Sequence, residues 1–223
     1  MSACKPMWTM LFKEKFFHVP LTEQPEYNGT QLIHSKVIAS YLRQLLRNDL
    51  QYAPFRMEGM EQDVREMMEI DTPQGKLALQ IGGTIDRLDS KGDTLRIVDY
   101  KTGGTPKTPE NIEQLFTPAD NRPNYIFQTF LYAAILCRKQ SLKVAPSLLY
   151  IHRAASESYS PVIEMGAPRQ PKVPVNNFAF FEDEFRERLH GLLQEIFSQE
   201  ETFSQTEDTR KCEYCDFRSL CKR

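Results

Sequence analysis

Apolar residues recur at helical spacing from Thr30 onward, where Ile33, Val37, Tyr41 and Leu45 follow one another every four residues. This pattern predicts an amphipathic helix that begins in the capping region 28–30 and ends before a proline at position 54. Residues 1–27 mix aromatic residues with prolines and do not favour one element. We therefore expect a helical N-terminal segment over residues 1–54, either an insertion or the truncated start of a larger unit.

Strand patterns follow this segment. Apolar and polar side chains alternate over residues 76–81, and the strand is predicted to continue through residues 82–89. A turn at residues 90–93 leads into the apolar run of the next strand, so residues 85–89 and 95–101 are predicted to pair as an antiparallel hairpin. Residues 55–70, which precede these strands, are ambiguous.

The remaining elements complete an α/β order. Residues 125–139 predict a helix, residues 144–152 a buried strand and residues 181–196 an amphipathic helix, with proline-rich loops between them. This order predicts an α/β fold with a central mixed β-sheet flanked by helices. We expect the core of that fold over residues 55–201 and a separate cysteine-rich tail over residues 202–223.

Composition narrows the classes of protein. The 28 basic residues nearly balance the 30 acidic ones, which excludes a polybasic arm and an acidic disordered tail. No apolar run reaches the length of a membrane span, and the first residues lack the layout of a secretory signal. Three of the five cysteines lie in the last dozen positions, a pattern typical of a metal or cluster site and not of a disulfide framework. We therefore expect a cytoplasmic protein that contacts no membrane.

Two carboxylates mark the predicted hairpin. Asp86 lies on its first strand and Asp99 near the end of its second, and Lys101 shares a face with Asp99 because the two are two residues apart. Converging carboxylates repel each other unless a divalent cation lies between them, and oxygen ligands suit Mg²⁺ or Mn²⁺. A lysine beside such a cation can orient the attacking water or stabilise charge on a phosphate. The alternative is that these are solvated charges at strand ends.

These residues stand in two recognisable motifs. Residues 83–87 (GTIDR) and 97–103 (IVDYKTG) resemble motifs II and III of the PD-(D/E)XK nucleases, specifically their RecB/AddB-like branch. The resemblance implies a nuclease fold in which Asp86 and Asp99 bind Mg²⁺ or Mn²⁺ and Lys101 is the catalytic lysine. It also implies that the family's activity, cleavage of DNA, belongs to this chain.

Three further residues follow from the same resemblance. In this branch the backbone carbonyl of the residue matching Tyr100 often completes the metal coordination. Gln128 and Tyr132 lie at i and i+4 on the next predicted helix, so they share one helix face. They resemble a Gln-x-x-x-Tyr helix that contacts the active site and the DNA backbone. The alternative is a Tyr132 that packs in the core and an exposed Gln128.

The tail offers soft ligands for a second site. Cys212, Cys215 and Cys221 place three thiolates within reach of one centre, and zinc or an iron–sulfur cluster would need a fourth ligand. The same spacing ends AddB-type and related nucleases, where an upstream cysteine completes a structural [4Fe–4S] cluster. Cys4 is the candidate fourth ligand, unless that ligand lies upstream of this chain. A zinc-binding tail module is the alternative.

One motif matches imperfectly. Residues 29–34 (GTQLIH) are similar to the Gly-Thr-x-x-His helix that supplies motif I in this branch, which would make His34 a metal ligand. A helix-face histidine is the alternative, with the true motif I outside these residues.

Basic residues near the predicted site are candidates for binding DNA. Because the net charge is −2, contact with DNA would come from a local patch, and Lys107 and Arg122 flank the site. The resemblance implies an exonuclease-like domain, the C-terminal part of a RecB/AddB-type helicase–nuclease in recombinational DNA repair. A partner subunit or upstream helicase-like domains would supply unwinding, since no phosphate-binding loop of an ATP motor occurs here. The alternative is an inactive DNA-binding or scaffolding domain of such a complex.

Overall fold

The computed structural model describes residues 4–20, 22–23, 25–119, 122–156, 158–198, 202 and 204–223, with side chains from position 7 onward. The α-helices are α1 (Cys4–Phe12), α2 (Gly29–Tyr52), α3 (Asn124–Cys137) and α4 (Glu182–Phe197). The strands are β1 (Arg56–Thr72), β2 (Gly75–Lys91), β3 (Thr94–Lys101), β4 (Lys143–Tyr150), β5 (Glu164–Met165) and β6 (Val173–Pro174). A short π-helix (Lys13–Phe17) follows α1, and 3₁₀ turns cover Glu113–Leu115, Phe178–Phe180 and Thr209–Cys212.

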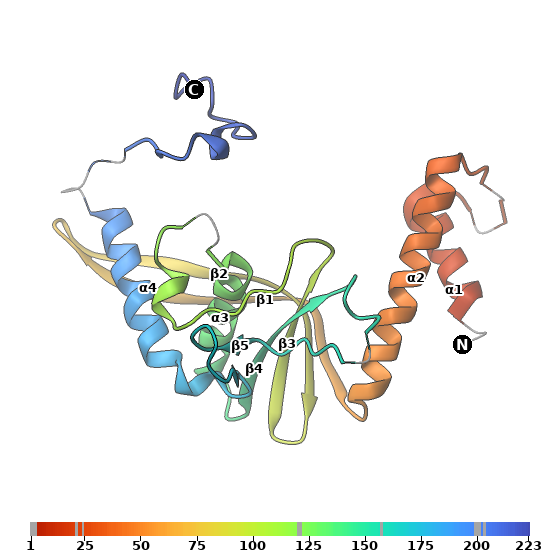
Figure 1. Ribbon diagram of the computed structural model, residues 1–223, viewed down its shortest axis with the longest axis horizontal. Coiled ribbons are helices and arrows are strands. Elements are labelled where there is room, and N and C mark those ends of the chain that lie inside the picture. The colour runs from red at the N-terminus through yellow and green to blue at the C-terminus, as the bar shows by residue number, and fades with distance from the viewer. Residues whose placement is uncertain are drawn as a thin grey trace.

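The central sheet has the strand order β1-β2-β3-β4 (Figure 1). β1 and β2 form a long antiparallel ribbon, β2 and β3 pair antiparallel, and β3 and β4 pair parallel. A parallel pair needs a crossover connection, which α3 supplies here. The expected fold is therefore confirmed: an α/β domain with a mixed sheet flanked by helices.

Both faces of β3 are covered. Ile97 belongs to the larger core, where α3 and α4 contribute the buried rings of Phe130 and Phe185. Val98 points to the opposite face and packs with Leu149 against the C-terminal half of α2. This double burial explains why β3 reads as a continuous apolar run and not as an alternating strand.

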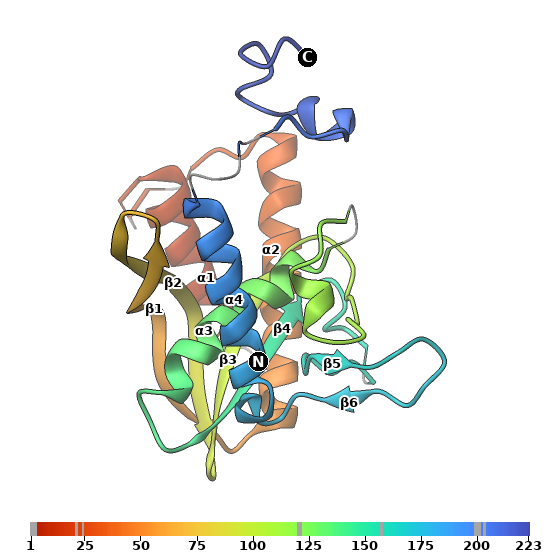
Figure 2. The ribbon, with the colours of Figure 1, turned by 90° about the vertical axis from the view of Figure 1, so that its left-hand side faces the viewer.

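The helix α2 is capped at its N-terminus and packs on the sheet near its C-terminus. Asn28 Oδ1 accepts a hydrogen bond from Gln31 N (2.9 Å), and Gln31 Oε1 accepts one from Asn28 N (3.0 Å), which forms a capping box at the predicted start. The C-terminal half of α2 packs on the sheet through Tyr41 and Leu45. Its N-terminal half stands off from the sheet beside α1 (Figures 1 and 2), and Ile33 remains 62% exposed there.

Several sequence predictions are refined by the structure. The unassigned residues 55–70 form most of β1, and the predicted helices at 125–139 and 181–196 shift by only one or two residues at each end. No described helix combines the length and the apolar character that a membrane crossing would need. The expected domain boundary at residue 201 falls outside the described residues.

Candidate active site and metal centre

The two motif carboxylates meet where β2 and β3 separate. Arg87 and Val98 are the last paired residues of this ladder, and Asp86 and Asp99 each lie one residue beyond them. The backbone N–H of Tyr100 donates a hydrogen bond to Asp86 Oδ2 (2.8 Å), which ties the Asp86 side chain to β3. The predicted convergence of the two carboxylates on one edge therefore follows from the register of the hairpin.

Asp99 is the buried member of this pair, with 4% of its surface exposed. Burial raises the pKa of its carboxyl, the Lys101 ammonium opposes this shift, and the charge of Asp86 adds to it. Lys101 Nζ lies 2.6 Å from the buried Asp99 Oδ2 and forms an ion pair with it. A carboxylate oxygen can serve more than one cationic partner, so Oδ2 retains the capacity to bind a metal ion.

The donor set fits a hard divalent cation. Mg²⁺ usually keeps several waters and takes one or two carboxylates from the protein. Asp86 and Asp99 supply these, and the Tyr100 carbonyl follows Asp99 at the end of β3. Among the described residues, no three His, Cys, Asp or Glu side chains gather closely enough to hold a metal ion. Asp86, Asp99 and the Tyr100 carbonyl are therefore the oxygen donors that could hold a hard divalent cation at this site.

A chain of contacts leads from Lys101 to α3. Lys101 Nζ donates to Gln128 Oε1 (3.4 Å), and Gln128 Nε2 donates to the Tyr132 hydroxyl (3.0 Å). Tyr132 is 5% exposed, and its ring packs beside Gly83, in the motif at residues 83–87. A Cβ atom at position 83 would lie 2.6 Å from Tyr132 Oη, so this glycine makes room for the ring. The structure thus joins Lys101, Gln128 and Tyr132 in one chain of contacts, and the Tyr132 ring packs in the hydrophobic core.

Sequence reasoning missed one aromatic contact of the lysine. Lys101 Nζ lies 4.3 Å from the ring centroid of Tyr125, a cation–π distance. Tyr125 precedes Gln128 by three positions and Tyr132 by seven, so all three lie on one face of α3. The spacing of these three residues is visible in the sequence and could have identified Tyr125 as a neighbour of the site.

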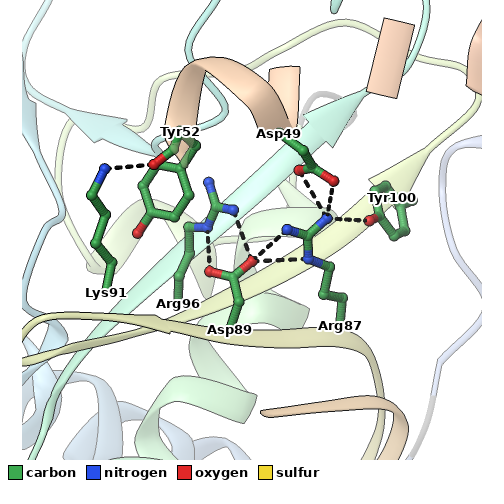
Figure 3. Close-up of polar contacts among 7 residues, drawn as sticks. All are labelled: Asp49, Tyr52, Arg87, Asp89, Lys91, Arg96 and Tyr100. Atoms are coloured by element: carbon green, nitrogen blue, oxygen red, sulfur yellow. Dashed lines mark hydrogen bonds and ion pairs between the residues drawn. The ribbon is translucent and has the colours of Figure 1, made fainter. Parts of the chain in front are cut away.

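Arg87, in the motif at residues 83–87, organises a buried ionic network next to the site (Figure 3). Arg87 Nη1 donates to both carboxylate oxygens of Asp49 on α2 (2.8 and 2.9 Å) and to the Tyr100 hydroxyl (3.1 Å). Burial opposes the charge of Arg87, but the hydrogen bonds to Asp49 and Tyr100 outweigh it and raise its pKa. Since the Tyr100 N–H also holds Asp86, this network links α2 to the Asp86 carboxylate through β3.

Asp89 bridges Arg87 and Arg96 in the same network. It is fully buried and accepts hydrogen bonds from Arg87 Nε (2.9 Å), Arg96 Nε (2.9 Å) and Arg96 Nη2 (2.8 Å). The Arg96 guanidinium in turn stacks over the Tyr52 ring at the end of α2, 3.5 Å from its centroid. No local sequence signal connects Asp49 or Tyr52 to residues about 40 positions later, so only the fold shows this contact.

The structure does not bring His34 to the two carboxylates. It lies on the exposed N-terminal half of α2, and it joins no metal-binding group within the described part of the chain. The end of α2 that reaches the site region instead contributes Asp49, which binds Arg87.

The predicted cluster cysteines of the tail are free thiols. Cys215 is exposed, and Cys212 and Cys221 are partly exposed. The side chain of Cys4 lies outside the described residues, and the described thiols form no metal-binding group.

The two candidate DNA-binding cations lie together in the loop region between β3 and α3. Lys107 Nζ donates to the backbone carbonyl of Arg122 (3.2 Å), and Arg122 Nε donates to Asn124 Oδ1 (2.9 Å). Both basic residues line a pocket that also includes Tyr125. They therefore lie near Tyr125, the residue whose ring contacts Lys101.

Comparison with known proteins agrees with this geometry. The family profile described as the PD-(D/E)XK nuclease superfamily matches residues 3–222. A search of the curated proteins finds no match.

Proposed function

Because this chain belongs to the PD-(D/E)XK nuclease superfamily, we propose that it hydrolyses DNA phosphodiester bonds with the help of Mg²⁺ or Mn²⁺. One observation carries the proposal: the buried Asp99 carboxylate forms an ion pair with Lys101 (2.6 Å) and lies one residue beyond a ladder whose other strand carries Asp86. Buried carboxylates whose pKa is raised are common at functional sites, which supports this assignment.

The chain's own residues account for binding and positioning. Asp86, Asp99 and the Tyr100 carbonyl would hold the cation, which supplies Lewis-acid activation of the phosphate and of water when bound. Lys101 is fixed by Asp99, by Gln128 and by the Tyr125 ring, so a flexible side chain is pre-organised. From this position its ammonium orients the attacking water or stabilises negative charge on the phosphate.

The helix α3 has a second task in this proposal. Tyr132 is held against Gly83 and supports Gln128 through its hydroxyl, so Gln128 keeps the lysine in place and faces the strand that is cut. Lys107 and Arg122 would bind neighbouring phosphates, which gives affinity that depends on salt and not on sequence.

The finer biological setting is also a proposal. We propose an exonuclease-like domain of a RecB/AddB-type helicase–nuclease in recombinational DNA repair, with unwinding supplied by a partner subunit or an upstream helicase-like domain. The motifs at residues 83–87 and 97–103 support it.

An iron–sulfur cluster belongs to the same proposal. Its support is the spacing of Cys212, Cys215 and Cys221, with Cys4 as the proposed fourth ligand. Iron and acid-labile sulfide measured per chain after anaerobic purification would decide it: both elements together support a cluster, and zinc alone supports the tail module instead.

The decisive test of the nuclease proposal compares lysine variants. Labelled linear single- and double-stranded DNA is incubated with Mn²⁺ and the wild type, Lys101→Ala or Lys76→Ala. Lys76 is a matched control because it pairs with Glu69 in the outer part of the β1–β2 ribbon and is largely exposed. Lys101→Ala is expected to lose about 10²–10³-fold in rate, the usual effect of removing one preorganised charge-stabilising donor. Equal cleavage by the wild type and Lys101→Ala would refute the catalytic assignment.

A further inference from the structure

A pocket of about 320 Å³ lies next to Tyr125, whose ring contacts Lys101. We call it the Tyr125 pocket; residues from the loop after β3, the start of α3 and the end of β4 line it, among them Gly104, Lys107, Arg122, Asn124, Tyr125 and Tyr150. Its volume falls at the lower end of the range of about 300–1,000 Å³ that is usual for small-molecule sites. The pocket is therefore large enough for one small organic group and too small for a duplex.

Tyr125 connects the pocket to the site. Its ring lies 4.3 Å from Lys101 Nζ and also lines the pocket, and 44% of the residue is exposed. A group that lies against this ring is therefore adjacent to the phosphate that Lys101 would contact.

The backbone of Gly104 brings the aromatic lining close. A Cβ atom at this position would lie 3.4 Å from Tyr125 Cε2 and 3.9 Å from Tyr150 Cε1, so the glycine lies between the two rings. Its φ of +79° is one that side-chain-bearing residues rarely adopt. The lining thus combines flat aromatic surface with a loop that leaves space next to it.

The polar lining suits an anion. Arg122 Nε binds Asn124, and Lys107 binds the Arg122 carbonyl, so both cationic side chains are held at the pocket by contacts to its own residues. Aromatic rings beside held cations are what a nucleotide needs, since a base stacks on the ring and its phosphates pair with the cations.

We propose that the Tyr125 pocket binds one unpaired nucleotide next to the scissile phosphate, with the base stacked on Tyr125 and a flanking phosphate near Arg122 and Lys107. This inference deepens the proposed nuclease function and rests on it. A base inside a duplex cannot lie flat against a side chain without leaving its stack. The pocket therefore selects single-stranded or frayed DNA ends over intact duplex.

The test removes the Tyr125 ring and the DNA base separately and together. Binding of a fluorescent single strand and of an abasic strand of the same length is measured by anisotropy in EDTA, for the wild type, Tyr125→Ala, Tyr125→Phe and the control Phe180→Ala. Phe180 is a suitable control because it is 84% exposed and does not line the pocket. Tyr125→Ala is expected to weaken binding of the ordinary strand about 10- to 100-fold and to leave the abasic strand within about twofold. Tyr125→Phe keeps the ring and should bind like the wild type.

A second variant separates the phosphate contact from the base contact. Arg122→Gln should weaken both strands equally and lower the slope of log affinity against log salt by about one. Thermal unfolding of each variant shows whether it folds. If Tyr125→Ala weakens both strands equally, or neither strand, the stacking proposal is overturned.

Failure of this proposal can be told from failure of the proposed function. The binding cycle needs no metal and no cleavage, whereas the Lys101→Ala comparison measures cleavage alone. If Tyr125→Ala weakens binding of the ordinary strand alone but no DNA is cleaved, the pocket proposal stands and the nuclease proposal fails. If DNA is cleaved but Tyr125→Ala does not distinguish the two strands, the nuclease proposal stands and the pocket proposal fails.

Discussion

Replacing Asp89 with asparagine removes the negative charge that lies between two buried arginines while keeping the size of the side chain. Asp89 is fully buried and accepts three hydrogen bonds of 2.8–2.9 Å from Arg87 and Arg96, each of which is at most 5% exposed. The asparagine would also direct an amide N–H toward a guanidinium. Two arginines would then remain buried with much of their compensating charge gone.

The size of the effect follows from this burial. Breaking a buried ion pair by removing one partner costs about 3–5 kcal/mol of folding free energy. For a chain of this size each kcal/mol lowers Tm by about 2–4 °C, so Asp89→Asn should lower Tm by about 6–20 °C. The loss is this large because both arginines keep the cost of desolvation after the carboxylate is removed.

The assay is reversible unfolding in urea and by heat, followed by far-ultraviolet circular dichroism. Asp63→Asn on the same β1–β2 ribbon is the control, because its ion pair with Arg65 (3.2 Å) is exposed to solvent. That variant should leave the midpoint nearly unchanged. If Asp89→Asn were no less stable than Asp63→Asn, the network in Figure 3 would not be holding α2 to the sheet as argued.

Two further variants test the site itself. Asp99→Asn should abolish cleavage yet raise the Tm of the metal-free protein, because burial raises the pKa of Asp99 above its ordinary 3.8 and the folded chain holds more protons than the unfolded chain just above that pH. Metal-free wild type should therefore lose stability as the pH rises through the raised pKa of Asp99. Thermal unfolding in EDTA over a series of pH values measures this loss, and Asp99→Asn should not show it. Gly83→Ala should reduce cleavage, because its Cβ would lie 2.6 Å from Tyr132 Oη and displace the side chain that supports Gln128; an unchanged rate would contradict this role for the glycine.

Local patterns were sufficient for the elements that carry the site. The hairpin register follows from the turn before Thr94 and from the apolar run that ends at Asp99, and the i, i+4 spacing of Gln128 and Tyr132 fixes their common face. The capping region 28–30 predicted the start of α2, where the structure shows a capping box between Asn28 and Gln31. In each case the contact partners lie within one turn or one short strand pair, so the sequence spacing determines the geometry.

Other parts of the fold depend on contacts that spacing does not reveal. Burial alternates along β1 over residues 64–72, but its sequence does not alternate in the same way. The charged Glu66 takes an inward position, where it pairs with Arg186, and the apolar Met67 faces solvent. The contact of Asp49 with Arg87 spans 38 positions and depends on how α2 crosses the sheet. Tyr125 was visible at helical spacing, but its contact with Lys101 depends on where β3 ends relative to α3.

The candidate site is built from one uninterrupted stretch of chain, from Gly83 on β2 to Tyr150 on β4. The helix α2 braces it from outside this stretch through Asp49, a contact that does not depend on how the chain is joined beyond α2. New chain ends could therefore be opened at the solvent-facing turn between β1 and β2, near Gly75, in a circular permutant whose original ends are joined by a linker. Such a permutant keeps the hairpin, the crossover helix and the pocket in their native order. Cutting the chain inside residues 102–123 would instead separate Asp86 and Asp99 from the helix that contacts Lys101.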